Sequence, residues 1–271
     1  MEPTGVSTDD RVFWTLAPAA AGQILSACEG LYSIKDYGPD GLLRGRSRST
    51  SSSWLPLYAR RFLDTRGGAF VVHGLNLVGG ALTLTARRSH SRQVIGAALM
   101  SASALLFENR NPYGRDGSDQ MSGVVNGYRV VTAFVPGRAT SNDVFLRAVN
   151  AQTTLSYLAS GLAKAISHTW RSGRALEMVL QTEMYGHTPA AKYFVRHPRL
   201  ARLLTWSTVA WESGYPLIFL LPRPLTRLAL LGVKAFHLGI AVTMGLPRFL
   251  WGFSGAHSAV EYVLDQRGDA G

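Results

Sequence analysis

Lys164 lies in the middle of an apolar stretch that runs from Tyr157 to Trp170 with the sequence YLASGLAKAISHTW. Lysine is rare in this chain: of 28 Lys and Arg residues, the lysines are Lys35, Lys164, Lys192 and Lys234. An amine can lose its proton when it is desolvated, whereas a guanidinium stays charged, so a lysine kept in an apolar helix is a candidate general base. The alternative is a side chain near a helix end that extends to the aqueous boundary.

The residues around Lys164 form one polar stripe if the stretch is helical. At 3.6 residues per turn, this stripe contains Tyr157, Gly161, Lys164 and His168, and the opposite face contains Leu155, Leu158, Leu162 and Ile166. A membrane helix turns such a stripe toward protein or a wet cavity. Gly161 leaves room there for a ligand or for a closely packed helix. We therefore expect a site on this face, with a polar contact that only holds helices together as the alternative.

Two further ionisable residues lie inside later apolar stretches. Glu212 occurs in AWESGYP and His237 in VKAFHLG, with Lys234 three residues before His237 on the same helical face. A carboxylate and an imidazole at a depth comparable with that of Lys164 provide charge pairing or a proton relay. Each alone is commonly structural, but three ionisable groups on successive apolar helices favour a functional site.

The elements that must position these residues have the length of membrane spans. Two pairs of apolar segments, separated by short basic connections, are Gly68–Ala86 with Gln93–Phe107 and Arg202–Leu221 with Leu225–Leu246. The sequence therefore predicts an all-α fold: a polytopic integral membrane helical bundle of six or seven spans with short interfacial or re-entrant helices. We expect a single transmembrane domain over residues 1–271.

The remaining segments are less regular. The expected elements are a weak first span over 11–34, a basic loop over 44–54, a polar loop over 109–120, the lysine helix over 145–169, an amphipathic helix over 171–185 and a tail after the last span. The stretch 123–135 contains Asn126 and Arg129, and it is either a re-entrant or interfacial helix or a span whose polar face is covered by protein. The distribution of basic residues among the connections favours seven spans with an external N-terminus.

Composition excludes several classes of function. The net charge is +11 and the pI about 10.2, but the arginines lie in short connections, as is typical of residues that flank membrane spans. No zinc-finger spacing or other nucleic-acid-binding motif occurs, so the expected partner is the lipid bilayer and not nucleic acid. The first ten residues, MEPTGVSTDD, lack the positive segment of a signal peptide, so insertion is expected to depend on the internal spans.

The chain has little sign of metal or thiol chemistry. Cys28 is its one cysteine and cannot form an intramolecular disulfide. No His-x3-His or His-Glu-x2-His motif occurs. His257 and Glu261, four residues apart, could share a metal, but a local ion pair is the simpler interpretation. We expect no metal site.

The pattern Tyr157-x3-Gly161-x2-Lys164, followed by Trp170-x2-Gly173, resembles the signature helix of the vitamin K-dependent γ-carboxylase superfamily, whose bacterial members are called HTTM-domain proteins. Glu212-Ser-Gly-Tyr-Pro216 and the segment around His237 are similar to the next two helices of that family, in the same order. The resemblance covers residues of about 145–249, and it implies an HTTM-like core there. It also implies location in the membrane, namely the bacterial cytoplasmic membrane.

In that family a basic lysine deprotonates vitamin K hydroquinone, and the resemblance implies this role for Lys164, with His237 and Glu212 as further catalytic residues. It also implies substrate contacts at Tyr157, Gly161, His168, Trp170 and Lys234. The carboxylase has two adjacent lysines, whereas this chain has Ala163 before Lys164. The carboxylase also has a large extramembrane domain that binds its protein substrate, and we expect no such domain in this chain.

These departures indicate an enzyme that acts on a hydrophobic metabolite, a quinone or a short peptide within the bilayer. The cofactor is unknown, and a quinone or hydroquinone is the one that the resemblance suggests. The alternative function is that of a non-catalytic maturation, export or immunity factor for a secreted peptide.

Overall fold

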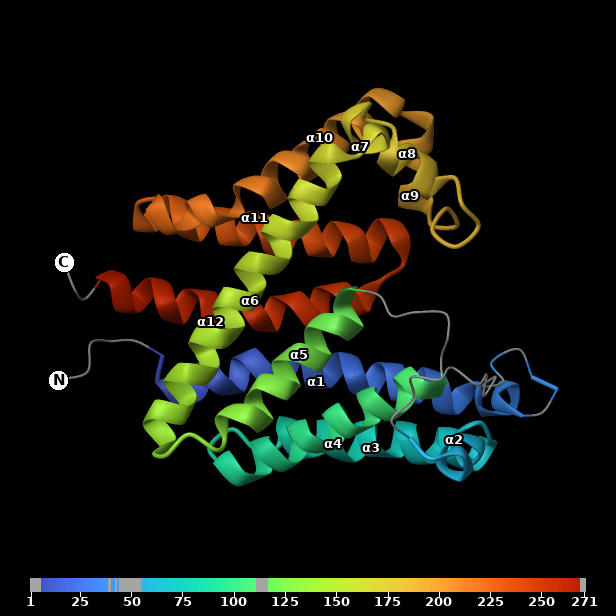
Figure 1. Ribbon diagram of the computed structural model, residues 1–271. Coiled ribbons are helices and arrows are strands. Elements are labelled where there is room, and N and C mark those ends of the chain that lie inside the picture. The colour runs from blue at the N-terminus through green and yellow to red at the C-terminus, as the bar shows by residue number, and fades with distance from the viewer. Residues whose placement is uncertain (1–5, 39, 42, 44–54, 111–116, 269–271) are drawn as a thin grey trace. The chain divides into compact units, whose positions relative to one another are not determined.

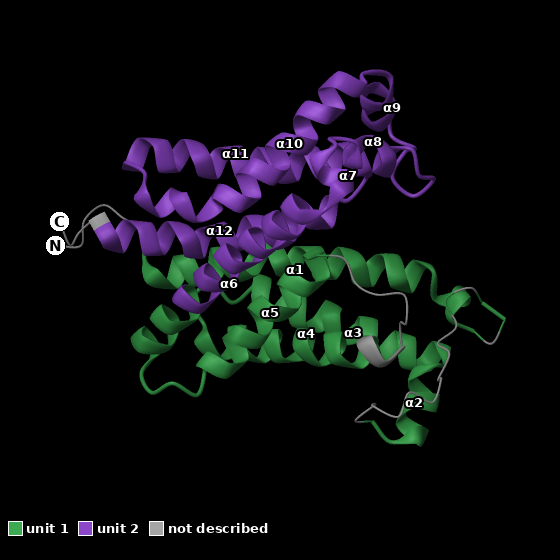
Figure 2. Ribbon diagram, turned by 45° about the horizontal axis from the view of Figure 1, so that its top comes forward, with its two compact units in different colours: residues 1–146 green, residues 147–271 purple. Residues whose placement is uncertain are grey.

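The structure is a computed structural model of the chain, and it describes residues 6–38, 40–41, 43, 55–110 and 117–268. Its regular elements are all helices, and no β-strand occurs in the described ranges (Figure 1). The all-α prediction is therefore confirmed. The chain divides into two compact units, residues 1–146 and residues 147–271 (Figure 2), and the boundary falls inside the helix α6, Arg138–Ile166. The predicted basic loop over 44–54 lies outside the described residues, as do residues 111–116 of the predicted polar loop.

The first unit contains a set of long helices and the first turns of α6. Its other elements are α1 (Thr8–Tyr32), η1 (Ile34–Tyr37), α2 (Leu57–Leu63), α3 (Arg66–Leu84), α4 (His90–Arg110) and α5 (Gly117–Thr132). Two of the helices begin at side-chain caps: the hydroxyl oxygens of Ser7 and Thr65 accept hydrogen bonds from the backbone N–H groups of Asp10 (3.2 Å) and Gly68 (3.1 Å). These caps satisfy donors of the first turn that have no partner within the helix.

Small residues set the helix packing of this unit. The helix α3 packs against α1 and α4, and α4 packs against α5. A Cβ atom on Gly79 would lie 2.7 Å from the carbonyl oxygen of Gly96, so only glycine fits at this crossing of α3 and α4. A Cβ atom on Gly80 would similarly meet Ile24 of α1. Close backbone approach through small residues is typical of helices that associate in a membrane.

Residues 123–132 of the stretch 123–135, for which two interpretations were open, belong to α5. The buried residues of this helix include Ser118, Ser122, Asn126 and Arg129, which recur every three or four residues and form one polar face. That face is covered by protein, but α5 is not among the described helices that are long and apolar enough to cross a membrane, so both interpretations stay open.

The second unit continues with α6 and ends with two long helices. Its further elements are α7 (His168–Arg171), α8 (Ala175–Leu180), α9 (Pro189–Arg196), α10 (Pro198–Gly214), η2 (Tyr215–Leu220), α11 (Arg223–Met244) and α12 (Pro247–Gly268). Proline occupies the first turn of several of them because its missing N–H is not needed there. The helices α11 and α12 pack along each other, and α10 contacts α8 and α9.

Two predicted elements of this unit were wrong. The tail expected after the last span is the helix α12, which begins at Pro247 directly after Gly245 ends α11 in a left-handed conformation with φ 70°. Of the amphipathic helix expected over 171–185, only the short helix α8 forms, and Gly173 separates it from α7. Gly173 has φ 75°, a conformation that interrupts a helix.

Apolar side chains are distributed in an unusual way on the two most apolar helices. On α3 the buried positions include Gly68, His73, Asn76 and Thr83, whereas Phe70 is 62% exposed. On α11 the exposed large residues are Leu225, Leu228, Leu231, Leu238 and Val242. These two helices are, by length and composition, apolar enough to cross a membrane among the described residues, with mean hydropathies of 1.4 and 1.5.

Candidate functional site

Lys164 contacts Glu212. The Nζ atom of Lys164, in the last turn of α6, lies 2.5 Å from Oε2 of Glu212, near the end of α10, and it also donates to Oγ of Ser160. The Glu212 side chain is 8% exposed and that of Lys164 is 19% exposed. Two residues that the sequence placed in separate apolar helices therefore form one ion pair in surroundings that are mostly closed to solvent. In such surroundings each charge depends on the other for compensation.

Trp170 and Gly161 complete the surroundings of this pair. The Nζ atom of Lys164 lies 5.1 Å from the centroid of the Trp170 ring, within the range of a cation–π contact. A Cβ atom on Gly161 would lie 2.6 Å from the carbonyl carbon of Glu212. The space above Gly161 is thus filled by the backbone of α10, so Gly161 serves the closely packed helix and not a ligand.

A second polar centre in the same unit is formed by Tyr157, His237 and His257. The Tyr157 hydroxyl oxygen lies 2.6 Å from Nε2 of His237 on α11 and 3.1 Å from Nε2 of His257 on α12. All three side chains are buried, with at most 3% of each residue exposed. Tyr157 lies on the same face of α6 as Lys164, two helical turns before it.

Aromatic rings hold this centre in place. The ring of Tyr215 lies 4.3 Å from that of Tyr157, and Phe253 stacks on His237 with 4.4 Å between ring centroids. Tyr157 and Tyr215 also belong to the buried cluster of the unit, together with Ile218, Leu230, Val233 and Val260. Rings packed in this way fix the direction in which the hydroxyl and the imidazole nitrogens point.

Several buried polar atoms near these two centres have no hydrogen-bond partner among the described residues. They are Nε1 of Trp211, Oγ of Ser213, the hydroxyl of Tyr215, Nδ1 of His237 and Nδ1 of His257. Buried polar groups are rarely left without a partner, and exceptions gather at sites that bind or react. Such atoms also occur elsewhere, at Arg60, Asn76, Ser101, Asn126, Arg129 and Asn150. The five atoms near Glu212 and Tyr157 therefore mark this region as the candidate site only together with the ion pair of Lys164 and the contacts of Tyr157.

Two predicted site residues take no part in the hydrogen bonds of these centres. Lys234 donates to Oε1 of Glu261 on α12 at 3.0 Å, so its charge is compensated there. The residue His168 is exposed. The structure therefore brings together Lys164 with Glu212, Gly161 and Trp170, and separately Tyr157 with His237.

His257 was missed as a member of the site because its segment was expected to be a tail. Its spacing from Glu261 indicates a local ion pair, but in the structure Nε2 of His257 faces the Tyr157 hydroxyl. The signal that could have found it is the recurrence of Phe249, Phe253 and His257 every four residues after Pro247, which is the spacing of one helical face. No group of three or more His, Cys, Asp or Glu side chains that could hold a metal ion occurs among the described residues.

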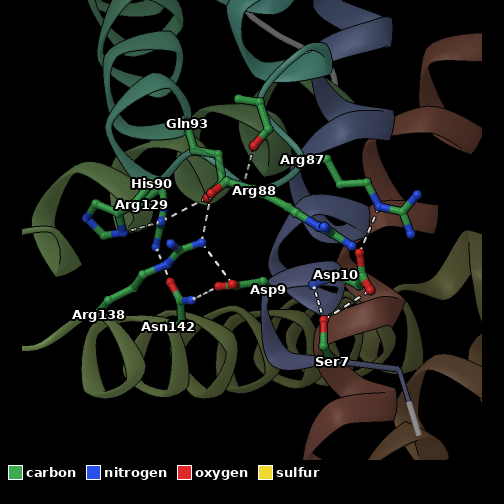
Figure 3. A network of polar contacts seen from close by, with 11 residues as sticks. Ser7, Asp9, Asp10, Arg87, Arg88, His90, Gln93, Arg129, Arg138 and Asn142 are labelled. Carbon is green, nitrogen blue, oxygen red and sulfur yellow. Dashed lines mark hydrogen bonds and ion pairs between the residues drawn. The ribbon is translucent and has the colours of Figure 1, made fainter.

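The first unit contains a polar network that the sequence did not predict (Figure 3). Arg129 is fully buried and donates to Oδ1 of Asn142 (3.0 Å), Oε1 of Gln93 (2.9 Å) and Nδ1 of His90 (2.8 Å). Asn142 in turn donates to Asp9 at 2.8 Å. The guanidinium is thus held by neutral acceptors, and Asp9 balances its charge through Asn142.

Arg138 in the first turn of α6 and Arg87 in the connection between α3 and α4 extend this network. Arg138 donates to Asp9 at 2.8 Å, and Arg87 donates to Asp10 at 2.8 Å. The hydrogen bond from Arg87 lowers the pKa of Asp10 below its ordinary value. Partial burial, followed by the charges of Arg129 and Arg138, lowers the pKa of His90. The network therefore favours an ionised Asp10 and a neutral His90.

Comparison with models of known protein families, with curated proteins and with solved structures gave no match for this chain.

Proposed function

We propose that the chain is an integral membrane enzyme of the vitamin K-dependent carboxylase-like superfamily, in which Lys164 takes a proton from a hydrophobic metabolite, a quinone or a short peptide. The observation that carries the proposal is the contact between Lys164 and the nearly buried Glu212. A protonated lysine must lose its proton before it can act as a base, and a carboxylate at contact distance can hold that proton.

The location in a membrane is supported by the exposed surfaces of the helices. Phe70 and Val78 on α3 and Leu228 and Leu231 on α11 are each more than half exposed. The buried positions of the same helices mix glycine, threonine and histidine with the apolar residues Ala69, Val72, Leu230 and Val233. Water would oppose this arrangement because it exposes apolar area, whereas lipid favours it. The bilayer is then the expected partner, and the bacterial cytoplasmic membrane is the proposed location.

The remaining site residues have supporting roles in this proposal. The ring of Trp170 provides a flat apolar surface beside the amine, suited to an aromatic substrate. The unpartnered atoms of Trp211 and Ser213 could bind the oxygen atoms of such a substrate. His237 and Tyr157 provide a second centre at which a proton can be held.

The test uses the reactivity of the lysines, since only a neutral amine is nucleophilic. The protein in lipid vesicles is treated at neutral pH with a membrane-permeant acylating reagent, and the modification of Lys35, Lys164, Lys192 and Lys234 is followed by peptide mass spectrometry. An amine in water is neutral for only about one part in 10³ at this pH. If Lys164 is a base, it should react about tenfold faster than Lys234, and a reaction slower than that of Lys234 would exclude the proposal.

Substitution of the base gives a second readout of the same proposal. Lys164→Arg keeps the charge and the hydrogen bonding but cannot give up a proton, so turnover of any substrate should fall by about 10²-fold or more while the protein still inserts. Lys234→Arg is the matched control and should have little effect, because an ion pair with Glu261 tolerates either cation.

The non-catalytic alternative, a maturation, export or immunity factor for a secreted peptide, is favoured by one observation. The contact between Lys164 and Glu212 joins α6 to α10 and would stabilise a helix pair without chemistry. In that case Lys164→Arg should retain function, and Lys164→Ala should unfold readily. Removing one partner of a buried ion pair costs about 3–5 kcal/mol.

A further inference from the structure

The hydroxyl of Tyr157 lies between two imidazoles and has only one proton to donate. It faces Nε2 of His237 at 2.6 Å and Nε2 of His257 at 3.1 Å. When Tyr157 donates to one of them, that Nε2 atom must be unprotonated, and the imidazole carries its proton on Nδ1. The other imidazole must then donate from its own Nε2 to the tyrosine oxygen. The two histidines are therefore expected to have opposite tautomers.

Both outer nitrogens of this triplet are buried and unpartnered among the described residues. Nδ1 of His237 and Nδ1 of His257 have no hydrogen-bond partner there, and His257 is completely buried. The ring of Phe253 stacks on that of His237, and the ring of Tyr215 packs at an angle against that of Tyr157, so the imidazole of His237 and the hydroxyl stay directed at each other. The result is a short chain of hydrogen bonds whose two ends are unpartnered Nδ1 atoms, one on α11 and one on α12.

We propose that His257, Tyr157 and His237 form a proton relay whose two ends are the Nδ1 atoms of the histidines. A proton binds to Nδ1 of His257, and the proton on Nε2 of His257 moves to the Tyr157 oxygen. The original hydroxyl proton then moves to Nε2 of His237, and the proton on Nδ1 of His237 leaves. One proton enters and one leaves, and no group keeps a net charge. Both tautomers are exchanged at the end, so the reverse passage restores the starting arrangement.

The relay assigns a role to His257 and makes Tyr157 a carrier of protons. It does not depend on the reaction proposed for Lys164, because it needs only the three side chains and their hydrogen bonds. Proton transfer between partners at 2.6–3.1 Å requires no movement of the backbone, and imidazole is suited to both accepting and releasing a proton.

The experiment observes the imidazole nitrogens directly. The full-length protein, labelled with ¹⁵N in histidine and held in detergent micelles at pH 7, is studied by long-range ¹H–¹⁵N NMR, and the two buried histidines are assigned with His237→Gln and His257→Gln. The expected result is one Nδ1–H and one Nε2–H tautomer, or a pair of averaged signals that change in opposite directions with temperature. Two identical tautomers, or an imidazolium at either position, would overturn the relay.

Substitution of the carrier gives a second test. In the relay the tautomer of His237 depends on His257 through the Tyr157 hydroxyl. Replacing His257 should therefore change the tautomer of His237 when Tyr157 is present, and it should have no such effect in Tyr157→Phe. Tyr193→Phe, at an exposed tyrosine of the same unit, is the matched control and should leave the linkage intact. Linked tautomers that persist in Tyr157→Phe would also overturn the relay. Neither measurement uses the reactivity of Lys164, so failure of the relay and failure of the proposed function are distinguishable.

Discussion

The glycine at position 161 determines how close α10 comes to Lys164. A Cβ atom there would lie 2.6 Å from the carbonyl carbon of Glu212 and 2.7 Å from Oγ of Ser213. Backbone atoms cannot move aside as a flexible side chain can, so any larger residue must push α10 away from α6. The same displacement would separate Glu212 from Lys164, which makes the ion pair depend on a residue that carries no functional group.

The change Gly161→Ala is therefore expected to destabilise the protein by about 1–3 kcal/mol, the usual cost of overpacking. Gly232→Ala on α11 is the control, since no atom lies within 4 Å of its Cβ position. There the gain in helix propensity, about 1 kcal/mol, should leave stability unchanged or raise it. Thermal unfolding in detergent measures both variants, and equal midpoints for the two would contradict the close approach of α6 and α10.

At the scale of elements, the network around Arg129 joins the ends of several helices of the first unit. Arg129 on α5 reaches His90 and Gln93 on α4, and Asn142 on α6 connects it to Asp9 on α1. His90 must be unprotonated at Nδ1 to accept from a guanidinium. Its protonation would replace that hydrogen bond by the repulsion of two cations.

This arrangement predicts a stability that depends on pH. The pKa of His90 is lower in the folded chain than in the unfolded chain, mainly because of partial burial and next because of Arg129. The unfolded chain therefore binds the proton first, and the contribution of His90 is fully present above about pH 6.5 and is lost as the pH falls below it. His90→Asn keeps an acceptor oxygen and should reduce the loss of stability between pH 7 and pH 5. Equal losses in both proteins, measured by chemical unfolding in detergent, would contradict the prediction.

At the scale of the whole molecule, the exposed apolar faces of α3 and α11 predict how the chain behaves in a cell. Proteins held by charge alone are released from membranes by salt, whereas proteins that span the bilayer require detergent. We expect the chain to stay with the membrane fraction in concentrated salt and at alkaline pH, and to dissolve only in detergent. A peripheral membrane protein, which salt should release, serves as the control. Release of this chain by salt would exclude the proposed membrane location.

The sequence by itself determined the helices and the residues capable of chemistry. Apolar periodicity placed both ends of α3 and α11 within two residues, since this signal is local, whereas α6 begins at Arg138, before the expected start at position 145. The unusual lysine and the carboxylate of Glu212 were identified from their apolar surroundings. The spacing of Tyr157, Gly161 and Lys164 also gave the correct shared face of α6.

Only the tertiary structure decided which of these residues meet. Lys164 and Glu212 are 48 positions apart, and Tyr157 and His257 are 100 positions apart. Their contacts depend on how whole helices pack, which no local pattern specifies. Lys234 was expected in the site but pairs with Glu261, whereas His257 was assigned to a tail and lies against Tyr157. The physical reason is that the angle at which a helix crosses its neighbours decides which of its side chains are buried. Those angles follow from side-chain packing between segments that are distant in the sequence.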